Sequence, residues 1–424
     1  MKIMIQSHYL VFPVYTHATE KQLTFSQKGK TVFQVNLKLD NASPDFFAYI
    51  DVSLFKNEIL ELSVSPEMPI RYTESDHMAI DNLYHEAIRP QAHFTPKSGW
   101  MGVPDALIRS EGNYVLLYPH NPAETEPGNG HWGYAVSKDL VHWTEEFAPV
   151  FPQEGSIVLR GYERVVFDTL RKLRFLGEWE HTEKFTLSAQ TGERKIVRFL
   201  DNGKYLVGDM KNGVFAPTQK EKTLRYGGTV NAGVMFDDLS TDRVIRMDWD
   251  GCKTARFCGQ MSIPMEISLE KLKDEYVLVA SPVKELQSLY KNTNRYEDLV
   301  IPAGGAMDIP LADSANMIYL RGESKKTGTM TLHIFGREIL ADFENNRISA
   351  GGAECPLSIT GDCVDLTVLV DRMGMEIYAD GGRIYMSALT EEMFMDRNLL
   401  SFSLHCDEEY LADLIEIHAL ESIW

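Results

Sequence analysis

The chain has 424 residues, which is too long for one hydrophobic core and predicts two or three domains. It carries 42 Lys and Arg against 61 Asp and Glu, and the net charge of −19 disfavours nucleic acid or an anionic membrane surface as a partner. The hydrophobic fraction of 44%, with no apolar run near ~18 residues, is typical of a globular protein outside the membrane.

The first segment of the chain is rich in strand signals. Residues 9–14, 31–39 and 46–54 are dense in β-branched and aromatic side chains, and the second of these alternates apolar and polar positions. A polar, helix-like stretch follows near residues 74–87. These patterns predict a small β domain over residues 1–88.

Short strands separated by Gly, Asn, Asp and Pro turns fill residues 89–275. Regular short antiparallel strands are typical of a β-propeller or a β-sandwich. A leucine-spaced stretch at residues 283–290 predicts a linking helix. The strands then return up to the C-terminus, in a number typical of one β-sandwich, so we expect a last domain over residues 276–424.

Five cysteines in this length do not indicate a disulfide framework, because the number is odd and the nearest pair, Cys252 and Cys258, stands alone. We expect reduced thiols and a cytoplasmic location, since the opening MKIMIQSH is too short and too polar to predict a signal peptide. The sequence has no Gly-rich phosphate loop and no cluster with metal-ligand spacing. We therefore expect no metal, nucleotide or flavin cofactor.

Aromatic, imidazole and amide side chains gather between residues 93 and 143, and this is the composition that a sugar pocket needs. Aromatic rings stack on the apolar faces of sugars, while imidazole and amide groups bond the hydroxyl groups. The candidates for sugar binding are Trp100, His120, Asn121, His131 and Trp132. The alternative is that these side chains only fill the core of a propeller.

Several motifs resemble glycoside hydrolase family 32, the invertase, inulinase and levanase family. Residues 93–105 read HFTPKSGWMGVPD, similar to the family's HFTPxxxWMNDPN, and residues 131–143 read HWGYAVSKDLVHW, similar to HWGxAxSxDLxHW. Further matches are GQMSIPMEI at 259–267 and DRMGMEIYADG at 371–381, so the resemblance spans nearly the whole chain. It implies an all-β protein with an N-terminal β domain, a β-propeller and a C-terminal β-sandwich.

The resemblance also implies retaining hydrolysis of β-fructofuranosides, in which one carboxylate attacks the sugar and another protonates the leaving group. Glu180, in a WEH triplet similar to the family's WECP, takes the place of the acid/base. The nucleophile of the family is the Asp of NDPN. That position holds Val103, after Gly102 in place of Asn, and valine cannot form the covalent fructosyl intermediate.

Three acidic residues offer a replacement for the missing nucleophile. Asp105 is the first candidate, as a relocated nucleophile or as a base that activates water, and Asp168 and Glu183 have weaker cases. The alternative for Asp105 is a solvated turn residue. A lone general acid supplies about 10²–10⁴-fold acceleration, against ~10⁶ or more for enzymes, so we expect the family's standard hydrolysis to be impaired.

The interval between Val103 and Glu180 is shorter than is usual in the family, and it lacks the family's RDP motif. At ~40–50 residues per blade, one or two blades of the propeller are missing. Strand edges at such a gap need covering, so we expect a homo-oligomer or capping by the flanking domains.

Three functions remain open from the sequence. The chain is a non-catalytic carbohydrate-binding or regulatory protein, a glycosidase with a relocated nucleophile or base, or a scaffold that completes its propeller by dimerising. In the first two, the ligand or substrate is a β-fructofuranoside or a related small carbohydrate.

Overall fold

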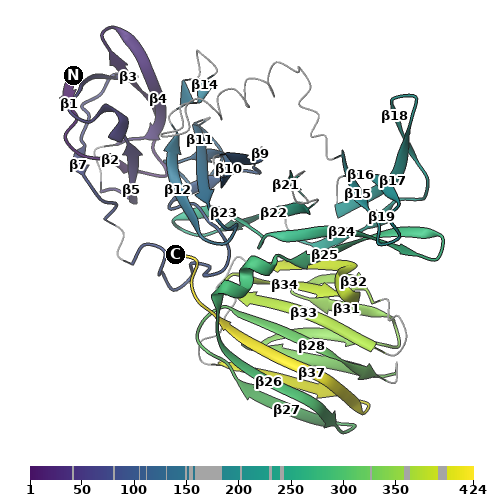
Figure 1. Ribbon diagram of the computed structural model, residues 1–424. Helices are drawn as coiled ribbons and strands as arrows, with labels where there is room; N and C mark the ends of the chain where they lie inside the picture. Colours follow the sequence, from purple (N-terminus) through teal and green to yellow (C-terminus); the bar gives the residue numbers. More distant parts are fainter. Residues whose placement is uncertain are drawn as a thin grey trace.

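The computed structural model of the chain is built almost entirely of β-strands, with a few short 3₁₀ helices in its described part (Figure 1). The described residues are 1–40, 43–79, 82–104, 106–110, 112–129, 131–148, 150–151, 156–157, 184–200, 203–228, 232–238, 243–324, 327–357, 363–389 and 399–424. Across these residues no helix has the length and the apolar character needed to cross a membrane. The predicted all-β architecture is confirmed.

The N-terminal domain consists of two small sheets packed on one core. One sheet has the order β1 (Lys2–Met4), β6 (Ile59–Ser65), β3 (Glu20–Gln27), β4 (Lys30–Lys38), and the other has the order β5 (Phe46–Asp51), β2 (Tyr9–Val14), β7 (Thr73–Ser75). The expected alternation in β4 is present, because Phe33, Val35 and Leu37 are buried while their neighbours are half-exposed. The 3₁₀ helix η1 (Ser53–Phe55) closes this core.

The helix-like stretch predicted near residues 74–87 is wrong where the structure describes it. Thr73–Ser75 forms strand β7, which pairs with β2, and turns follow it. Glu74 accepts hydrogen bonds from the backbone N–H groups of Gln6 (2.9 Å) and Ser7 (3.1 Å). These contacts with a distant part of the chain override the local helix propensity.

The propeller domain is organised around a ten-stranded sheet. Its order is β12 (Trp143–Ala148), β11 (His131–Ser137), β10 (Asn113–Asn121), β8 (Gly99–Met101), β23 (Phe257–Met261), β22 (Arg243–Lys253), β24 (Met265–Leu272), β25 (Glu275–Pro282), with β9 (Ala106–Ser110) on β10 and β21 (Ala232–Asp238) on β22. Strand β8 is antiparallel to β10 and parallel to β23, so it joins strands from early and late parts of this domain's sequence.

A five-stranded sheet beside this one has the order β15 (Lys184–Ser188), β16 (Arg194–Phe199), β17 (Lys204–Lys211), β18 (Val214–Pro217), with β19 (Lys222–Thr223) also on β17. The pair β13 (Val150–Phe151) and β14 (Ser156–Ile157) completes the described strands of this domain.

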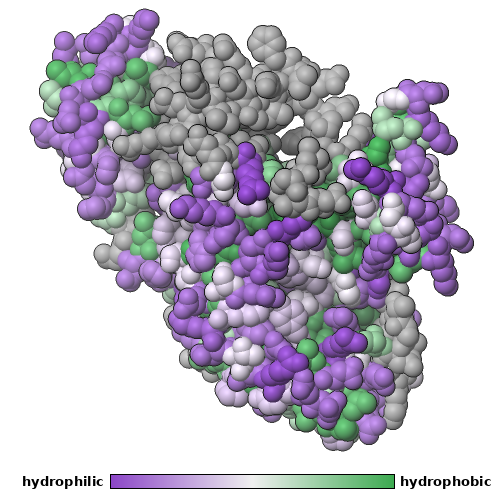
Figure 2. Space-filling model, in the orientation of Figure 1, coloured by the Kyte–Doolittle hydropathy of each residue, from purple (hydrophilic) through white to green (hydrophobic). Residues whose placement is uncertain are grey.

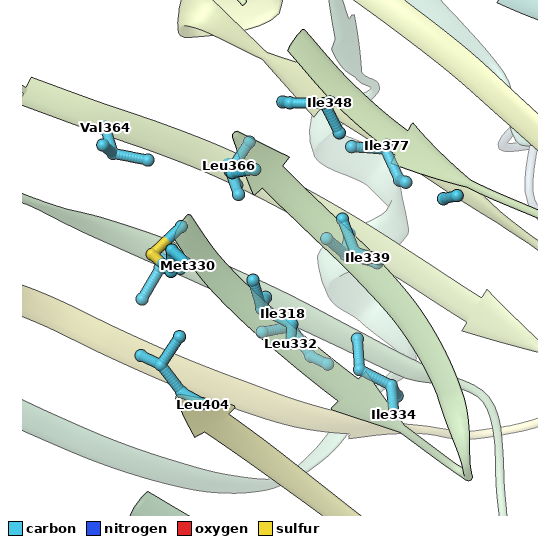
Figure 3. Close-up of a cluster of buried hydrophobic side chains, with 14 of the residues drawn as sticks. Ile318, Met330, Leu332, Ile334, Ile339, Ile348, Val364, Leu366, Ile377 and Leu404 are labelled. Atoms are coloured by element: carbon cyan, nitrogen blue, oxygen red, sulfur yellow. The ribbon is translucent and has the colours of Figure 1, made fainter. Parts of the chain in front are cut away.

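The C-terminal domain is a two-sheet sandwich, as predicted. One sheet has the order β20 (Arg225–Gly227), β35 (Ile384–Leu389), β34 (Gly374–Ala379), β33 (Cys363–Asp371), β28 (Asn316–Ser324), β37 (Tyr410–Leu420), β26 (Tyr290–Ile301). The other has the order β27 (Gly305–Pro310), β36 (Ser401–Cys406), β29 (Thr329–Ile334), β30 (Arg337–Asp342), β31 (Arg347–Ala350), β32 (Ala353–Pro356). Apolar side chains from the two sheets face one another in the core, among them Ile318 and Leu366 from one sheet and Leu332 and Leu404 from the other (Figure 3). The 3₁₀ helix η4 (Asp380–Gly382) connects β34 to β35.

The propeller and sandwich domains share buried contacts. Strand β20 leaves the propeller part of the chain and pairs in parallel with β35 of the sandwich. Within β20, the Arg225 guanidinium donates to Asp250 Oδ1 (2.5 Å), and Ser387 of β35 donates to Asp250 Oδ2 (2.9 Å). The predicted linking helix is a 3₁₀ helix, η3 (Lys284–Leu289), which packs between the domains. The two domains are therefore held by ion pairs, a shared sheet and an apolar layer.

The outer surface of the sandwich is mainly hydrophilic in the view of Figure 2, with apolar residues scattered over it. All five cysteines are free thiols, and only Cys363 among them is more than slightly exposed.

Candidate functional site

The candidate sugar-binding residues lie on three neighbouring strands. Strand β10 lies between β8 and β11, and the register pairs Asn121 with Trp100 and His120 with both Met101 and His131. Residues that are about 30 positions apart in the sequence are thereby brought to one end of one sheet.

His120 and His131 belong to the same face of β10 and β11, because directly paired residues point to the same side. Asn121 follows His120 directly in β10, so Asn121 and its partner Trp100 belong to the opposite face. The sheet therefore divides the predicted set of residues between its two faces.

Both histidines are buried and are held in the neutral form. Burial lowers the pKa of His120, whose Nδ1 donates to the Trp100 carbonyl oxygen (2.9 Å). Burial, reinforced by His120 and partly opposed by the backbone of Gln34, lowers the pKa of His131 to about 4. Gln34, whose backbone contacts His131, belongs to strand β4 of the N-terminal domain.

The side-chain amide nitrogen and oxygen of Asn121 both form hydrogen bonds with the loop that follows β10. Its Nδ2 donates to the Glu126 carbonyl oxygen (2.9 Å), and its Oδ1 accepts from Ala123 N (3.1 Å) and Asn129 Nδ2 (2.8 Å). Asn129 also donates to the Asn36 carbonyl oxygen (3.0 Å). Asn121 therefore ties this loop to the N-terminal domain.

A small pocket lies where the N-terminal domain meets the propeller domain. Its lining includes Tyr9 and Tyr49 from one side and Lys97, His120 and Glu145 from the other. Its volume of about 50 Å³ has room for a water molecule or two and none for a sugar ring. The Lys97 backbone N–H donates to Glu145 Oε2 (2.5 Å), which closes one wall. This pocket is therefore a small gap at the junction of two domains, and we do not assign it as the sugar site.

The turn after β8 departs furthest from the family pattern. The Trp100 ring lies over Gly102, where an added Cβ would come within 2.4 Å of the indole. The Gly102 N–H donates to the Pro119 carbonyl oxygen (2.8 Å). Val103 is half-buried and packs against an apolar cluster that includes Phe94 and Met101. At the position that the motif resemblance aligns with the family's nucleophile, this chain thus places an apolar side chain against its core.

The acidic candidates Asp105, Asp168, Glu180 and Glu183 lie outside the described residues, and so does the side chain of Trp132. Their predicted roles stay predictions. Among the described residues, no group of three or more His, Cys, Asp and Glu side chains could hold a metal ion.

A buried cluster joins three of the sequence motifs at the interface of the propeller and sandwich domains. His93 contacts Asp371 Oδ2 through Nδ1 (2.8 Å) and Glu376 Oε1 through Nε2 (3.1 Å). Glu376 also accepts from the Ile263 N–H (3.0 Å) and the Tyr378 hydroxyl (2.7 Å). The sequence analysis identified the motifs that contain these residues only by their resemblance to the family. In the structure, these residues link the propeller domain to the sandwich domain.

Comparisons with known proteins agree with this architecture. The family model for the glycosyl hydrolases family 32 N-terminal domain matches residues 93–157. Levanase of Bacillus subtilis is 21% identical in an alignment that covers 87% of this chain and 76% of the levanase. The chain is thus similar to glycoside hydrolase family 32 proteins over most of its length. The invertase of Schizosaccharomyces pombe is 39% identical over 71 residues, which are 17% of this chain and 12% of the invertase.

Solved structures of family 32 proteins have the same fold. Exo-inulinase from Aspergillus awamori superposes with a TM-score of 0.63 at 16% identity, covering 80% of this chain and 100% of the inulinase. The β-fructofuranosidase of Schwanniomyces occidentalis, solved with fructosyl-erythritol, gives 0.63 at 15% identity, covering 79% of this chain and 98% of that enzyme. At these identities the likeness concerns the fold alone.

The charged state of His93 makes the stability of this protein depend on pH. Burial by itself would lower the pKa of His93, but the hydrogen bonds to Asp371 and Glu376 outweigh it and raise the pKa to about 10. Because the folded pKa lies above the unfolded value of 6.5, the stabilisation is fully present below pH 6.5 and is lost as the pH rises towards 10.

We therefore expect the free energy of unfolding to fall between pH 7 and pH 10, by at most ~1.4 kcal/mol per pH unit from this group. Urea unfolding at several pH values measures it. The His93→Gln variant, which has no charge to lose, should give a flatter profile over the same range. If the free energy of unfolding fell equally steeply with pH in the wild type and in His93→Gln, the pH dependence could not be assigned to His93.

Proposed function

We propose that this family 32 protein binds a β-fructofuranoside or a related small carbohydrate in its propeller domain and does not hydrolyse it by the family's retaining mechanism. The observation that carries the proposal is the packing of Val103 against the apolar cluster of β8 and its neighbours. A residue at this position would have to present an oxygen atom to the sugar for retaining chemistry to begin.

The neighbourhood of Val103 supports the loss of the retaining mechanism. That mechanism needs two carboxyl groups about 5–5.5 Å apart, one to attack the sugar carbon and one to protonate the departing oxygen. Gly102 has no side chain to orient a substrate, and the indole of Trp100 fills the space that an Asn side chain would enter. Among the described residues of this turn, Gly99–Pro104, none therefore offers an attacking group for covalent catalysis.

The relatives supply the ligand class. Levanase, invertase and exo-inulinase are the names of proteins that are similar to this chain, and one solved relative contains fructosyl-erythritol. Trp100 is half-buried at the same turn and offers an aromatic ring on which a sugar can stack. A fructose-containing sugar is therefore the proposed ligand.

Isothermal titration with fructose, sucrose and nystose tests the binding directly. We expect the wild-type chain to bind at least one of them with a Kd between micromolar and millimolar, and Trp100→Ala to bind at least about tenfold more weakly. Trp100→Phe keeps an aromatic face and is the matched control, with an affinity close to that of the wild type. Absence of binding by the wild type to all three sugars would contradict the proposal.

A further inference from the structure

We propose a second carbohydrate site, on the outer face of the sandwich domain, in the groove lined by Tyr290, Tyr319, Arg321, Asp365 and Glu416. The ligand class is a neutral oligosaccharide. The groove is made by strands β26, β28, β33 and β37 beside η3, and it contains none of the motif residues of the propeller domain. The inference rests on the proposed function only for its choice of fructan as a probe.

The strand register explains why the groove opens here. On the outer face of the seven-stranded sheet, Met317 lies beside Leu369, and both are buried against the propeller domain. One row further out, Tyr319 pairs with Thr367 and Glu416, and in the next row Arg321 pairs with Asp365. The sheet therefore turns from apolar to polar where it emerges from under the propeller domain.

Two tyrosines leave a hydroxyl hydrogen for a ligand. The phenol oxygens of Tyr290 and Tyr319 are 2.5 Å apart, and either of them can be the donor. Whichever one donates, the hydrogen of the other hydroxyl has no acceptor among the described residues of the chain. A hydroxyl group of a sugar can take that place.

The rings are fixed in position before any ligand arrives. Tyr290 stacks on His418 with ring centroids 3.9 Å apart and an interplanar angle of 20°, and His418 Nδ1 lies 2.8 Å from Thr293 Oγ1. Tyr319 meets the edge of the same imidazole at 5.8 Å. A site with fixed side chains loses less entropy on binding.

The groove carries charges of both signs. Glu416 lies against Arg295 and 2.7 Å from His418 Nε2, and Asp365 is half-buried opposite Arg321. The Arg321 side chain is 64% exposed and comes only within 4.0 Å of Asp413, so its guanidinium has hydrogens to donate. Hydrogen-bond donors and acceptors that lie side by side in this way match the hydroxyl groups of a neutral sugar.

The size of the groove also fits an oligosaccharide. Its volume is about 370 Å³, within the range of ~300–1,000 Å³ that small-molecule sites occupy. The exposed Gln287 of η3 stands at its rim. The junction pocket beside His120 is several times smaller.

Titration of the full-length chain with nystose, and with maltotriose as a second neutral oligosaccharide, tests the inference. We expect two nystose sites per wild-type chain. Arg321→Ala should weaken one site by about tenfold or more, and Tyr319→Phe, which keeps the ring, should weaken the same site by several-fold. Arg347→Ala is the matched control, because Arg347 is an exposed arginine on the other sheet of the sandwich. It should bind as the wild type does.

The Trp100→Ala variant separates this inference from the proposed function. If the sandwich site exists, Trp100→Ala keeps one nystose site, and that site is sensitive to Arg321→Ala. Binding that is abolished by Arg321→Ala and unchanged by Trp100→Ala would support the sandwich site and contradict the propeller site. Wild-type affinity and stoichiometry in both Arg321→Ala and Tyr319→Phe, or no binding of either oligosaccharide to the wild type, would overturn the inference.

Discussion

Replacing His93 with alanine should destabilise the folded chain by about 3–5 kcal/mol, the usual cost of removing one partner from a buried ion pair. His93 is 2% exposed and lies between Asp371 and Glu376, which are 1% and 3% exposed. Its removal would leave two carboxylates buried without their shared cation. The substitution also opens a cavity at the interface between the propeller and sandwich domains, which adds to the cost.

Urea unfolding at pH 7 measures this effect, and His142→Ala is the matched control. His142 is also paired with a carboxylate, since its Nδ1 lies 2.8 Å from Asp139 Oδ2, but its side chain is 50% exposed. An exposed pair contributes little, so this variant should stay within about 1 kcal/mol of the wild type. Comparable losses for the two variants would refute the role given to the buried cluster.

Restoring the family residues at the turn after β8 should destabilise the chain without making it a fructosidase. In a Gly102→Asn/Val103→Asp double variant, the Asn Cβ meets the Trp100 ring, which lies 2.4 Å from that position, so the indole has to move. The Asp carboxylate replaces an isopropyl group packed on an apolar cluster. We expect a loss of roughly 2–5 kcal/mol from overpacking and from placing a charge against apolar side chains.

No sucrose hydrolysis is expected from that variant, because other parts of the family pattern are missing as well. The sequence lacks the family's RDP motif, and the Pro119 carbonyl oxygen beside the turn is already bound to the Gly102 N–H. Thermal unfolding and a fructose-release assay on the same sample measure both effects. Val103→Ala, which trims the side chain without adding charge, is the control and should lose less stability. Sucrose turnover by the double variant would contradict the account.

The sequence predicts the strands and the fold class well, because both depend on local patterns. The alternation in residues 31–39 predicts the strand Lys30–Lys38, and its apolar positions are those that the structure buries. The helix-like stretch near residue 74 is wrong for a reason outside that segment. Its Glu74 binds the backbone at Gln6 and Ser7, and no pattern within the stretch records a contact with the start of the chain.

The candidate site was predictable only in part. Composition singles out Trp100, His120 and His131, which the structure places on neighbouring strands, yet it cannot tell which face of a strand a side chain occupies when the register is unknown. The histidines lie against the N-terminal domain, and Asn121 holds a loop. Asp105 and Glu180 lie outside the described residues, so the acid/base and nucleophile hypotheses rest on the sequence.

Long-range clusters were out of reach of sequence reasoning. His93 meets Asp371 across 278 positions of sequence, and the groove on the sandwich takes one to three residues from each of several strands. Neither the His93–Asp371 contact nor the groove follows a regular spacing of residues in the sequence, so neither can be recognised before the sheets are assembled. The only sequence signal for the His93 cluster was that its residues lie in three motifs that all resemble the family.

Sugar release tests the central claim most directly. We would incubate the wild-type chain with sucrose, inulin, levan and aryl glycosides beside Glu180→Gln and Asp105→Asn, and record melting temperatures with the same sugars. The account predicts no release above that of the two variants, together with a rise in the melting temperature of the wild type in the presence of a fructoside. Turnover by the wild type that is lost in both variants would contradict it, because a relocated pair of carboxylates would then be performing the hydrolysis.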